Sequence, residues 1–179
     1  MKIRLDSARF EPYRWQETLV FDPSGLGLPE GAELTPVEVR GMLSSTSPGF
    51  LLSARLVYRQ TVPCDRCLTP VEEAVESDVD LVVLERPRAA PRPTDEPLAE
   101  EELGVIEVAG DAFETAPLVV EQVQLGLPAH PLCREDCAGL CPTCGKDLND
   151  GACACAPSVD PRWAALAAWS EKKDGRGSD

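Results

Sequence analysis

The chain has 179 residues, 43% of them hydrophobic, a size and composition that suit one folded core with a small appendage. It carries 31 acidic against 17 basic residues, and the formal net charge of −14 opposes nonspecific binding to a phosphate backbone. No apolar run reaches the roughly 18 residues that suggest a membrane span, and residues 1–15 show no secretory signal, so we expect a cytoplasmic protein.

The first third of the chain predicts two strands after an irregular start. Residues 1–33 are expected to form a lead-in with one short strand at 17–21, because Pro and Gly dominate the segment that follows it. From Thr35 the apolar residues alternate with polar ones, a period of two that predicts a half-buried strand. A longer strand is predicted at 50–62, after a turn. The inward positions of these two strands are Val37, Val39, Gly41, Leu43, Phe50, Leu52, Ala54, Leu56, Tyr58 and Val62.

A C-x2-C pair, Cys64 and Cys67, interrupts the alternation between Pro63 and Pro70. The alternation then resumes as far as Val83, which predicts a third strand and places the cysteine pair at the tip of a hairpin. One apolar and one polar face on each strand favour an antiparallel sheet with its apolar side inward.

The polar face of the third strand is acidic. Residues 71–128 hold fifteen acidic and three basic residues, and four of the acids share the outward face of this strand: Glu72, Glu76, Asp78 and Asp80. Arg55 and Arg59 are expected across from Glu76 and Asp78. We favour cross-strand charge pairs there over an RNA-binding patch.

The second half of the chain is predicted to be less regular. Residues 86–102 hold four prolines, three arginines and five acids, and we expect a mobile loop because almost nothing in it can be buried. A short strand is predicted at 104–108. A helix is expected to begin near Thr115 as its N-cap and to end at Pro128. Ala116, Val119, Val120, Val123 and Leu127 form its apolar stripe. Asp160 and Pro161 predict the start of a last helix, followed by a disordered tail.

Together these elements predict an α+β fold. We expect an antiparallel sheet, barrel-like or half-open, with one packed helix in residues 1–128. A zinc-ribbon-like segment follows at 129–158, and the C-terminal helix and tail occupy 159–179.

Six further cysteines lie in one short segment, PLCREDCAGLCPTCGKDLNDGACAC. With the C-x2-C pair they give eight potential ligands: Cys64, Cys67, Cys133, Cys137, Cys141, Cys144, Cys153 and Cys155. Closely spaced thiols separated by Gly and Pro turns are typical of tetrahedral zinc sites. Eight thiolates suffice for two four-cysteine zinc sites, and such closed sites are structural, so nothing here predicts an enzyme or a small-molecule substrate.

Several pairings of the cysteines fit the sequence. We assign the last four to one ion, because their spacing can close a compact site without help from elsewhere. Cys133 and Cys137 then join Cys64 and Cys67. The single histidine, His130, is expected beside a site rather than in it. Disulfides, rubredoxin-like iron and dithiol redox chemistry are the competing interpretations of the cysteines.

Three stretches resemble the bacterial YceD family of large ribosomal RNA subunit accumulation proteins: CDRCL, then LVVEQVQLGLPAHPLCREDCAGLCPTCGKDLN, then CACAPSVDPRWAAL. The resemblance covers roughly residues 40–166. It implies a non-enzymatic cytoplasmic protein required for 23S rRNA accumulation or processing. Its implied partner is a large-subunit ribosomal protein or a pre-ribosomal particle. Some members lack the last four cysteines, which supports the pairing given above.

Two other functions compete with the one that the resemblance implies. A zinc ribbon that binds nucleic acid, including 23S rRNA, directly is the first alternative, since four-cysteine knuckles are common in such modules. The basic residues available for it are Arg40, Arg55, Arg59 and Arg66. Zinc storage or a redox role is the second alternative.

Overall fold

The computed structural model describes residues 1–86, 104–155 and 162. The chain divides into two compact units, Met1–Cys133 and Arg134–Asp179. Among the described residues, the first unit contains the strands and one α-helix, and the second contains the segment with the last five cysteines. The predicted domain boundaries remain predictions. Of the loop predicted at 86–102, Arg86 is instead the last residue of a strand, and the rest lies outside the described residues, as does the predicted C-terminal helix except Arg162.

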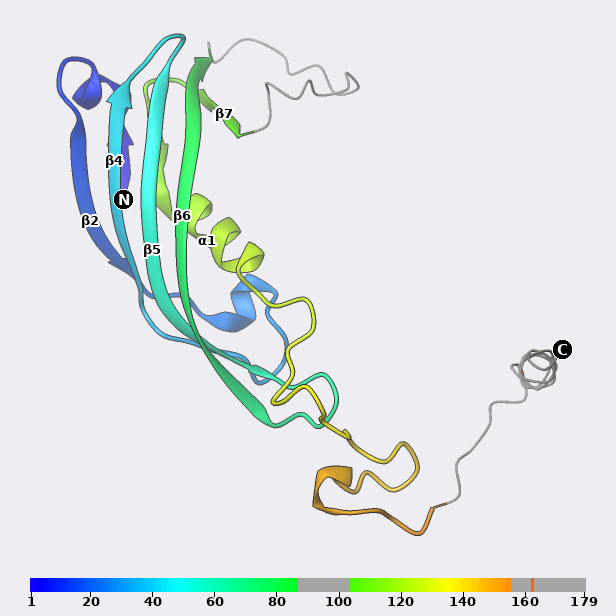
Figure 1. Cartoon of the computed structure of the whole chain (residues 1–179). Coiled ribbons are helices and arrows are strands. Elements are labelled where there is room, and N and C mark those ends of the chain that lie inside the picture. The colour runs from blue at the N-terminus through cyan, green and yellow to red at the C-terminus, as the bar shows by residue number, and fades with distance from the viewer. Residues whose placement is uncertain (87–103, 156–161, 163–179) are drawn as a thin grey trace, which may run out of the picture. The chain divides into compact units, whose positions relative to one another are not determined.

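A six-stranded sheet dominates the first unit (Figure 1). Its strands are β2 (Tyr13–Leu19), β3 (Glu33–Leu34), β4 (Val37–Ser45), β5 (Phe50–Pro63), β6 (Pro70–Arg86) and β7 (Val105–Ala109). The order is β2-β4-β5-β6-β7, with β3 pairing separately with β5. Every pair is antiparallel except β6 and β7, which run parallel. The sheet is open, so the half-open form of the predicted α+β fold is the one observed.

The alternation predicted for β4 and β5 is confirmed by burial. On β4, the inward residues Val37 and Leu43 are fully buried, and so is Leu52 on β5. The β4–β5 register places Leu43 directly opposite Leu52, so both apolar faces point to the same side of the sheet. Arg40 and Arg55, another directly opposed pair, lie on the exposed side.

Residues 1–33 are more regular than predicted. β1 (Lys2–Arg4) pairs with β8 (Ala112–Glu114) in a separate two-stranded sheet, and 3₁₀ turns occupy Leu5–Ala8 and Pro23–Leu26. The strand predicted at 17–21 is β2, which begins four residues earlier, at Tyr13. Its inward positions include Glu17, and a charged residue on the buried face hides the alternation that Trp15 and Leu19 would otherwise show.

The helix α1 (Thr115–Leu125) covers the inner face of the sheet (Figure 1). Val119 and Val123, four residues apart, lie on one side of it and pack against Val37 and Leu56. The prediction that Thr115 is the N-cap is wrong, because Glu114 holds that position. The buried Thr115 hydroxyl instead donates to the Met1 carbonyl oxygen. The helix also ends at Leu125, before the predicted Pro128. Within the described residues no helix has the length and apolarity required to cross a membrane.

Candidate metal centres

The tip of the β5–β6 hairpin holds the first C-x2-C pair. The two strands remain paired out to Pro63 and Pro70, and the Cys64 N–H donates to the Thr69 carbonyl oxygen over 2.9 Å. The Leu68 N–H closes the turn by donating to the Cys64 carbonyl oxygen, with Leu68 in the left-handed region at a φ of 63°. This geometry confirms the predicted hairpin tip and turns both cysteines toward the same point.

Four sulfur atoms form the first cluster. The Sγ atoms of Cys64, Cys67, Cys133 and Cys137 all lie within 4.8 Å of one another. The sulfurs of Cys67 and Cys133 are 3.5 Å apart. Zn–S bonds of about 2.3 Å would place tetrahedral sulfurs roughly 3.8 Å apart, so the cluster has the size of a four-thiolate metal site.

The segment before Cys133 is tied to the hairpin tip within the first unit. The backbone N–H of Asp65, which lies between the two hairpin cysteines, donates to the Pro131 carbonyl oxygen over 2.9 Å. The Asp65 carboxylate lies 3.1 Å from His130 Nδ1. His130 therefore contacts a residue of the knuckle and is outside the sulfur cluster, which is the role predicted for it.

The second cluster lies within a short stretch of the second unit. The Sγ atoms of Cys141, Cys144, Cys153 and Cys155 also lie within 4.8 Å of one another. Its knuckle resembles the first, because the Gly145 N–H donates to the Cys141 carbonyl oxygen over 2.9 Å. Gly145 has a φ of 71°, which glycine adopts at no steric cost. The two clusters are the two groups of four that the sequence spacing favoured.

Backbone N–H groups lower the pKa of one thiol in each cluster. The Cys67 N–H donates to the Cys64 sulfur and lowers the pKa of that thiol to about 6, although burial acts in the opposite direction. In the second cluster, the N–H groups of Cys144 and Thr143 lower the pKa of Cys141 to about 6. A hydrogen bond with the Cys144 side chain raises the pKa of Cys155 to about 11. The thiolate is the form that binds a metal, so these N–H groups favour the metal-binding form of Cys64 and Cys141.

Each cluster could therefore hold a metal ion. Four sulfur ligands complete a tetrahedron and leave no position for substrate or water, as in structural zinc sites. A set of four thiolates is also typical of iron. All eight cysteines lie in the described part of the chain, and none is joined in a disulfide.

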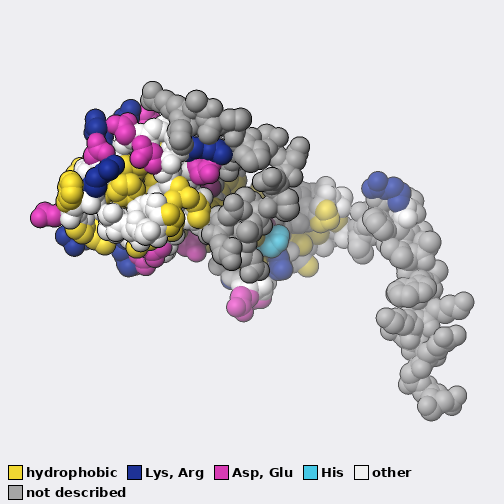
Figure 2. Space-filling model, turned by 90° about the horizontal axis from the view of Figure 1, so that it is seen from above, with side chains coloured by type: hydrophobic (Ala, Val, Ile, Leu, Met, Phe, Trp, Pro, Cys, Tyr) yellow, Lys and Arg dark blue, Asp and Glu magenta, His cyan; other side chains and the backbone are white. Residues whose placement is uncertain are grey.

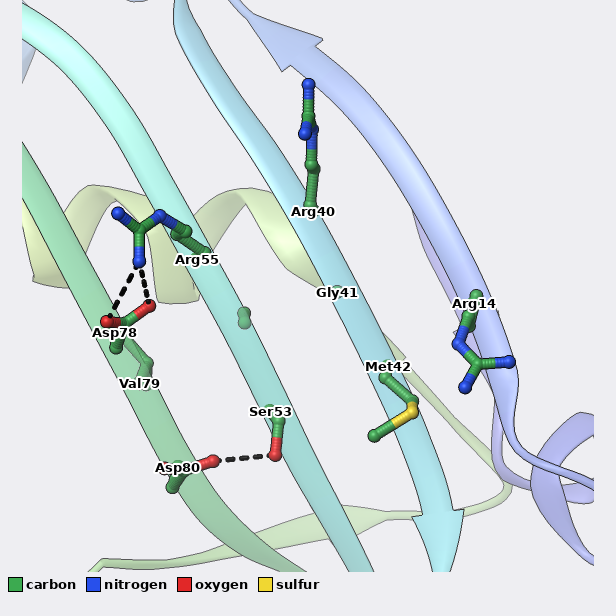
Figure 3. Close-up of a pocket in the computed structure, with 10 residues that line it drawn as sticks. Arg14, Arg40, Gly41, Met42, Ser53, Arg55, Asp78, Val79 and Asp80 are labelled. Carbon is green, nitrogen blue, oxygen red and sulfur yellow. Dashed lines mark hydrogen bonds and ion pairs between the residues drawn. The ribbon is translucent and has the colours of Figure 1, made fainter.

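The exposed face of the sheet carries three of the four arginines singled out in the sequence, Arg40, Arg55 and Arg59. Arg40 and Arg55 line a shallow open depression of about 520 Å³, together with Arg14 of β2 (Figure 3). Arg55 forms ion pairs with Glu76 and with Asp78, the latter at 3.3 Å. Arg14 precedes the strand predicted at 17–21, so the sequence gives no reason to place it on the sheet, although it lies on β2.

Arg59 and Arg66 lie outside this depression. The register places Arg59 opposite Ala74, and it lines a separate depression of about 240 Å³ with Thr35 and Glu72. Arg66 is exposed in the hairpin tip, between Cys64 and Cys67. The four arginines therefore do not line one depression, and among the described residues the expected charge pairing is found for Arg55 and not for Arg59.

The acidic face of β6 is confirmed as a row of exposed side chains. Glu72, Glu76, Asp78 and Asp80 are all exposed, and Asp80 accepts a hydrogen bond of 2.6 Å from Ser53. Acidic and basic side chains lie next to one another in the face of the molecule that Figure 2 shows, with hydrophobic side chains between them. The face shown in Figure 2 is mixed in charge, in contrast to the basic patch or stripe of nucleic-acid-binding modules.

Comparison with known proteins assigns the family. The family model of the large ribosomal RNA subunit accumulation protein YceD matches residues 52–169, a range that contains all eight cysteines. Uncharacterised proteins of Mycobacterium tuberculosis and Mycobacterium bovis are each 33% identical over 154 residues, covering 82% of this chain and 69% of theirs. One from Mycobacterium leprae is 29% identical over 131 residues, covering 73% and 58%. No solved structure matches the chain. The family match and the mycobacterial relatives together show that this chain belongs to the YceD family.

Proposed function

We propose that the protein is a ribosome-biogenesis accessory factor that supports accumulation or processing of 23S rRNA and assembly of the large ribosomal subunit. The observation that carries this proposal is the family match over residues 52–169, which covers the β5–β6 hairpin from Leu52 onward, α1 and both cysteine clusters. The protein acts in the cytoplasm, by binding rather than by catalysis.

Zinc is the metal proposed for both clusters. The sulfur spacing suits a tetrahedral ion of zinc size, and the N–H groups aimed at Cys64 and Cys141 favour the thiolate form. Sites closed by four protein ligands stabilise a fold, since binding of the ion is linked to folding of the segments that supply the ligands. The role of zinc in the proposed function is therefore to stabilise a binding surface.

The proposed partner is a basic large-subunit ribosomal protein or a pre-ribosomal particle that displays one. The exposed acidic row on β6 and a net charge of −14 support this choice, because opposite charges accelerate the encounter of two proteins. The acidic row would occupy the place that rRNA phosphates take once the partner is assembled.

Direct contact with 23S rRNA is the second candidate. The specific observation in its favour is the depression that Arg14, Arg40 and Arg55 line on the exposed sheet face (Figure 3). Arg55 is already engaged by Glu76 and Asp78, so fewer charges remain for phosphates than the count of arginines suggests. The protein partner is therefore favoured.

The test is depletion of the protein in its native host, followed by measurement of the ratio of 23S to 16S rRNA and of the ribosomal subunit profile. We expect a selective loss of 23S rRNA and of large subunits, restored by the wild-type chain. A double variant, Cys64→Ser/Cys67→Ser, should restore them poorly. Ala154→Ser, which adds a serine between Cys153 and Cys155 without removing a sulfur, should behave as wild type. An unchanged ratio of the two rRNAs after full depletion would contradict the proposal.

A further inference from the structure

One polar side chain links the two cysteine clusters. Asn149 lies in the loop between Cys144 and Cys153, the loop that the second cluster closes. Its Nδ2 donates to the Sγ atom of Cys137 over 3.5 Å, and Cys137 belongs to the first cluster. Asn149 therefore lies in the loop of one cluster and contacts a member of the other.

The orientation of the Asn149 amide is fixed by its other partners. Its Oδ1 accepts from the Ala138 backbone N–H at 2.8 Å and from Arg134 Nη2 at 2.7 Å, both of them donors. Its Nδ2 donates to Asp147 Oδ1 at 2.7 Å. If the amide oxygen and nitrogen were exchanged, the NH2 group would face two donors and the oxygen would face the Asp147 carboxylate. The orientation in which Nδ2 points at Cys137 is therefore the one that satisfies these hydrogen bonds.

The loop that carries Asn149 is well braced around the second cluster. The Cys141 N–H donates to the Lys146 carbonyl oxygen at 2.8 Å, and the Leu148 N–H donates to the Gly139 carbonyl oxygen at 2.9 Å. Lys146 Nζ donates to the Ala152 carbonyl oxygen at 3.0 Å. A loop with these bonds and four ligated sulfurs would hold Asn149 at one position, and a loop without the ligation would release it.

We propose that Asn149 is a positioning residue that makes the two clusters bind metal cooperatively. Metal in the second cluster fixes the loop and holds the Asn149 N–H against the Cys137 sulfur. That hydrogen bond stabilises the Cys137 thiolate and fixes its orientation toward the first metal. Groups that orient metal ligands in this way typically contribute 10–100-fold to affinity. Coupling is reciprocal, so metal in the first cluster also tightens the second. The inference rests on the proposed metal binding and is independent of the proposed role in ribosome assembly.

The test uses the purified, reduced, full-length protein and a chromophoric zinc chelator as competitor. Occupancy of each cluster is followed separately by alkylation and mass spectrometry, with exposed Cys133 reporting the first cluster and exposed Cys144 the second. Disabling the second cluster with Cys153→Ser/Cys155→Ser should weaken zinc binding in the first cluster about tenfold. Asn149→Ala should weaken the first cluster by a similar factor. Adding Asn149→Ala to the disabled protein should change little further, because the contact is already lost.

Two further variants keep the result interpretable. Asn149→Asp retains an acceptor for Ala138 and Arg134 but replaces the donor to Cys137 with a negatively charged oxygen, so it should weaken the first cluster at least as much as Asn149→Ala. Asp150→Ala, the exposed neighbour in the same turn, should match wild type. If the first cluster binds zinc equally tightly with the second cluster disabled, or if Asn149 variants weaken only the second cluster, the coupling is wrong. A protein that binds no zinc in any form would instead overturn the metal sites themselves.

Discussion

Trp15 lies directly across from Gly41 in the β2–β4 pair, and its indole ring occupies the space that a side chain at position 41 would need. A Cβ atom added to Gly41 would lie 2.1 Å from Trp15 Cζ2, well inside van der Waals contact. Trp15 is buried, with 9% of its surface exposed. The Trp15 ring on β2 thus fills the space left by the missing side chain of Gly41 on β4.

Gly41→Ala should destabilise the protein by about 1–3 kcal/mol, the usual range for overpacking a well-filled core. A Cβ at position 41 would overlap the indole ring, so the ring would have to move. The measurement is urea unfolding followed by tryptophan fluorescence. Gly25→Ala is the matched control, since a Cβ at position 25 meets nothing within 4 Å, and it should unfold as wild type does. Equal stabilities for the two variants would contradict the packing described for Trp15.

Zinc analysis should return about two equivalents for the reduced protein, one for each set of four thiolates. Cys144→Ser should lower the content of the second cluster, and Cys67→Ser that of the first. Elemental analysis of protein grown in zinc-supplemented medium checks the stoichiometry. Two equivalents of iron would support both metal sites but show that the metal is not zinc. Disulfide-bonded protein without metal would contradict both sites.

Removing a cysteine from one cluster should reduce amide protection in a different part of the chain than removing a cysteine from the other. Cys64 is fully buried at the tip of the β5–β6 hairpin, whereas Cys153 is only half-buried in a short loop. Cys64→Ser should therefore reduce amide protection in the paired residues near Pro63 and Pro70, and Cys153→Ser only between Cys141 and Cys155. Hydrogen exchange read by mass spectrometry distinguishes these patterns. Equal and global loss of protection in both variants would contradict the assignment of these cysteines to separate clusters.

Tyr58 should make stability fall in alkaline solution. Burial raises the pKa of its hydroxyl, and the nearby Glu73 carboxylate raises it further. The unfolded chain therefore loses this proton at a lower pH than the folded chain. The stability that Tyr58 contributes is complete below the unfolded pKa of about 10 and is lost as the pH rises toward the folded value. Tyrosinate absorbance should show a late step that Tyr58→Phe removes and Tyr13→Phe leaves in place. A single early step in the wild type would refute this.

Binding to a basic ribosomal protein should depend steeply on salt. Screening of opposite charges lowers the association rate as ionic strength rises. Neutralising the β6 row with Glu72→Gln, Glu76→Gln, Asp78→Asn and Asp80→Asn should slow association and leave the fold intact. Stopped-flow measurement over a range of salt concentrations gives the slope for each protein. Salt-sensitive binding to an rRNA fragment alone, abolished by Arg14→Ala/Arg40→Ala and not by the acidic variants, would reverse the choice between the two candidate partners.

The sequence predicted β4, β5 and β6 because apolar residues occupy most of the alternate positions on one face of each strand. On β5, Leu52, Leu56 and Tyr58 occur at strict period two and are all buried. β2 was only partly found, because Glu17 occupies one of its inward positions. The parallel direction of β7 could not be predicted, since a short apolar strand has the same pattern in either direction and its direction depends on where the chain returns to the sheet.

The cysteine clusters were predictable because ligand spacing limits which sulfurs can meet. Cys141 and Cys144 form a knuckle that needs only Cys153 and Cys155 to complete it. Asn149 gave no such signal, because a single asparagine in a loop is an ordinary turn residue until its neighbours are known. The N-cap at Glu114 was missed for a related reason. β8 extends as far as Glu114 through its pairing with β1, so a tertiary contact fixes where the helix begins.

The long β5–β6 hairpin has a consequence for the order in which the protein matures. Its pairings are local, from Pro63 with Pro70 at the tip to Phe50 with Val83 at the far end. Hairpins form in microseconds, whereas a ribosome needs roughly 3–14 s to add the chain between Cys67 and Cys137. The growing chain therefore presents a folded hairpin with only two of the four sulfurs of its cluster. During those seconds the apolar face of the hairpin also waits for α1, so we expect the newly made chain to depend most on chaperones in that interval.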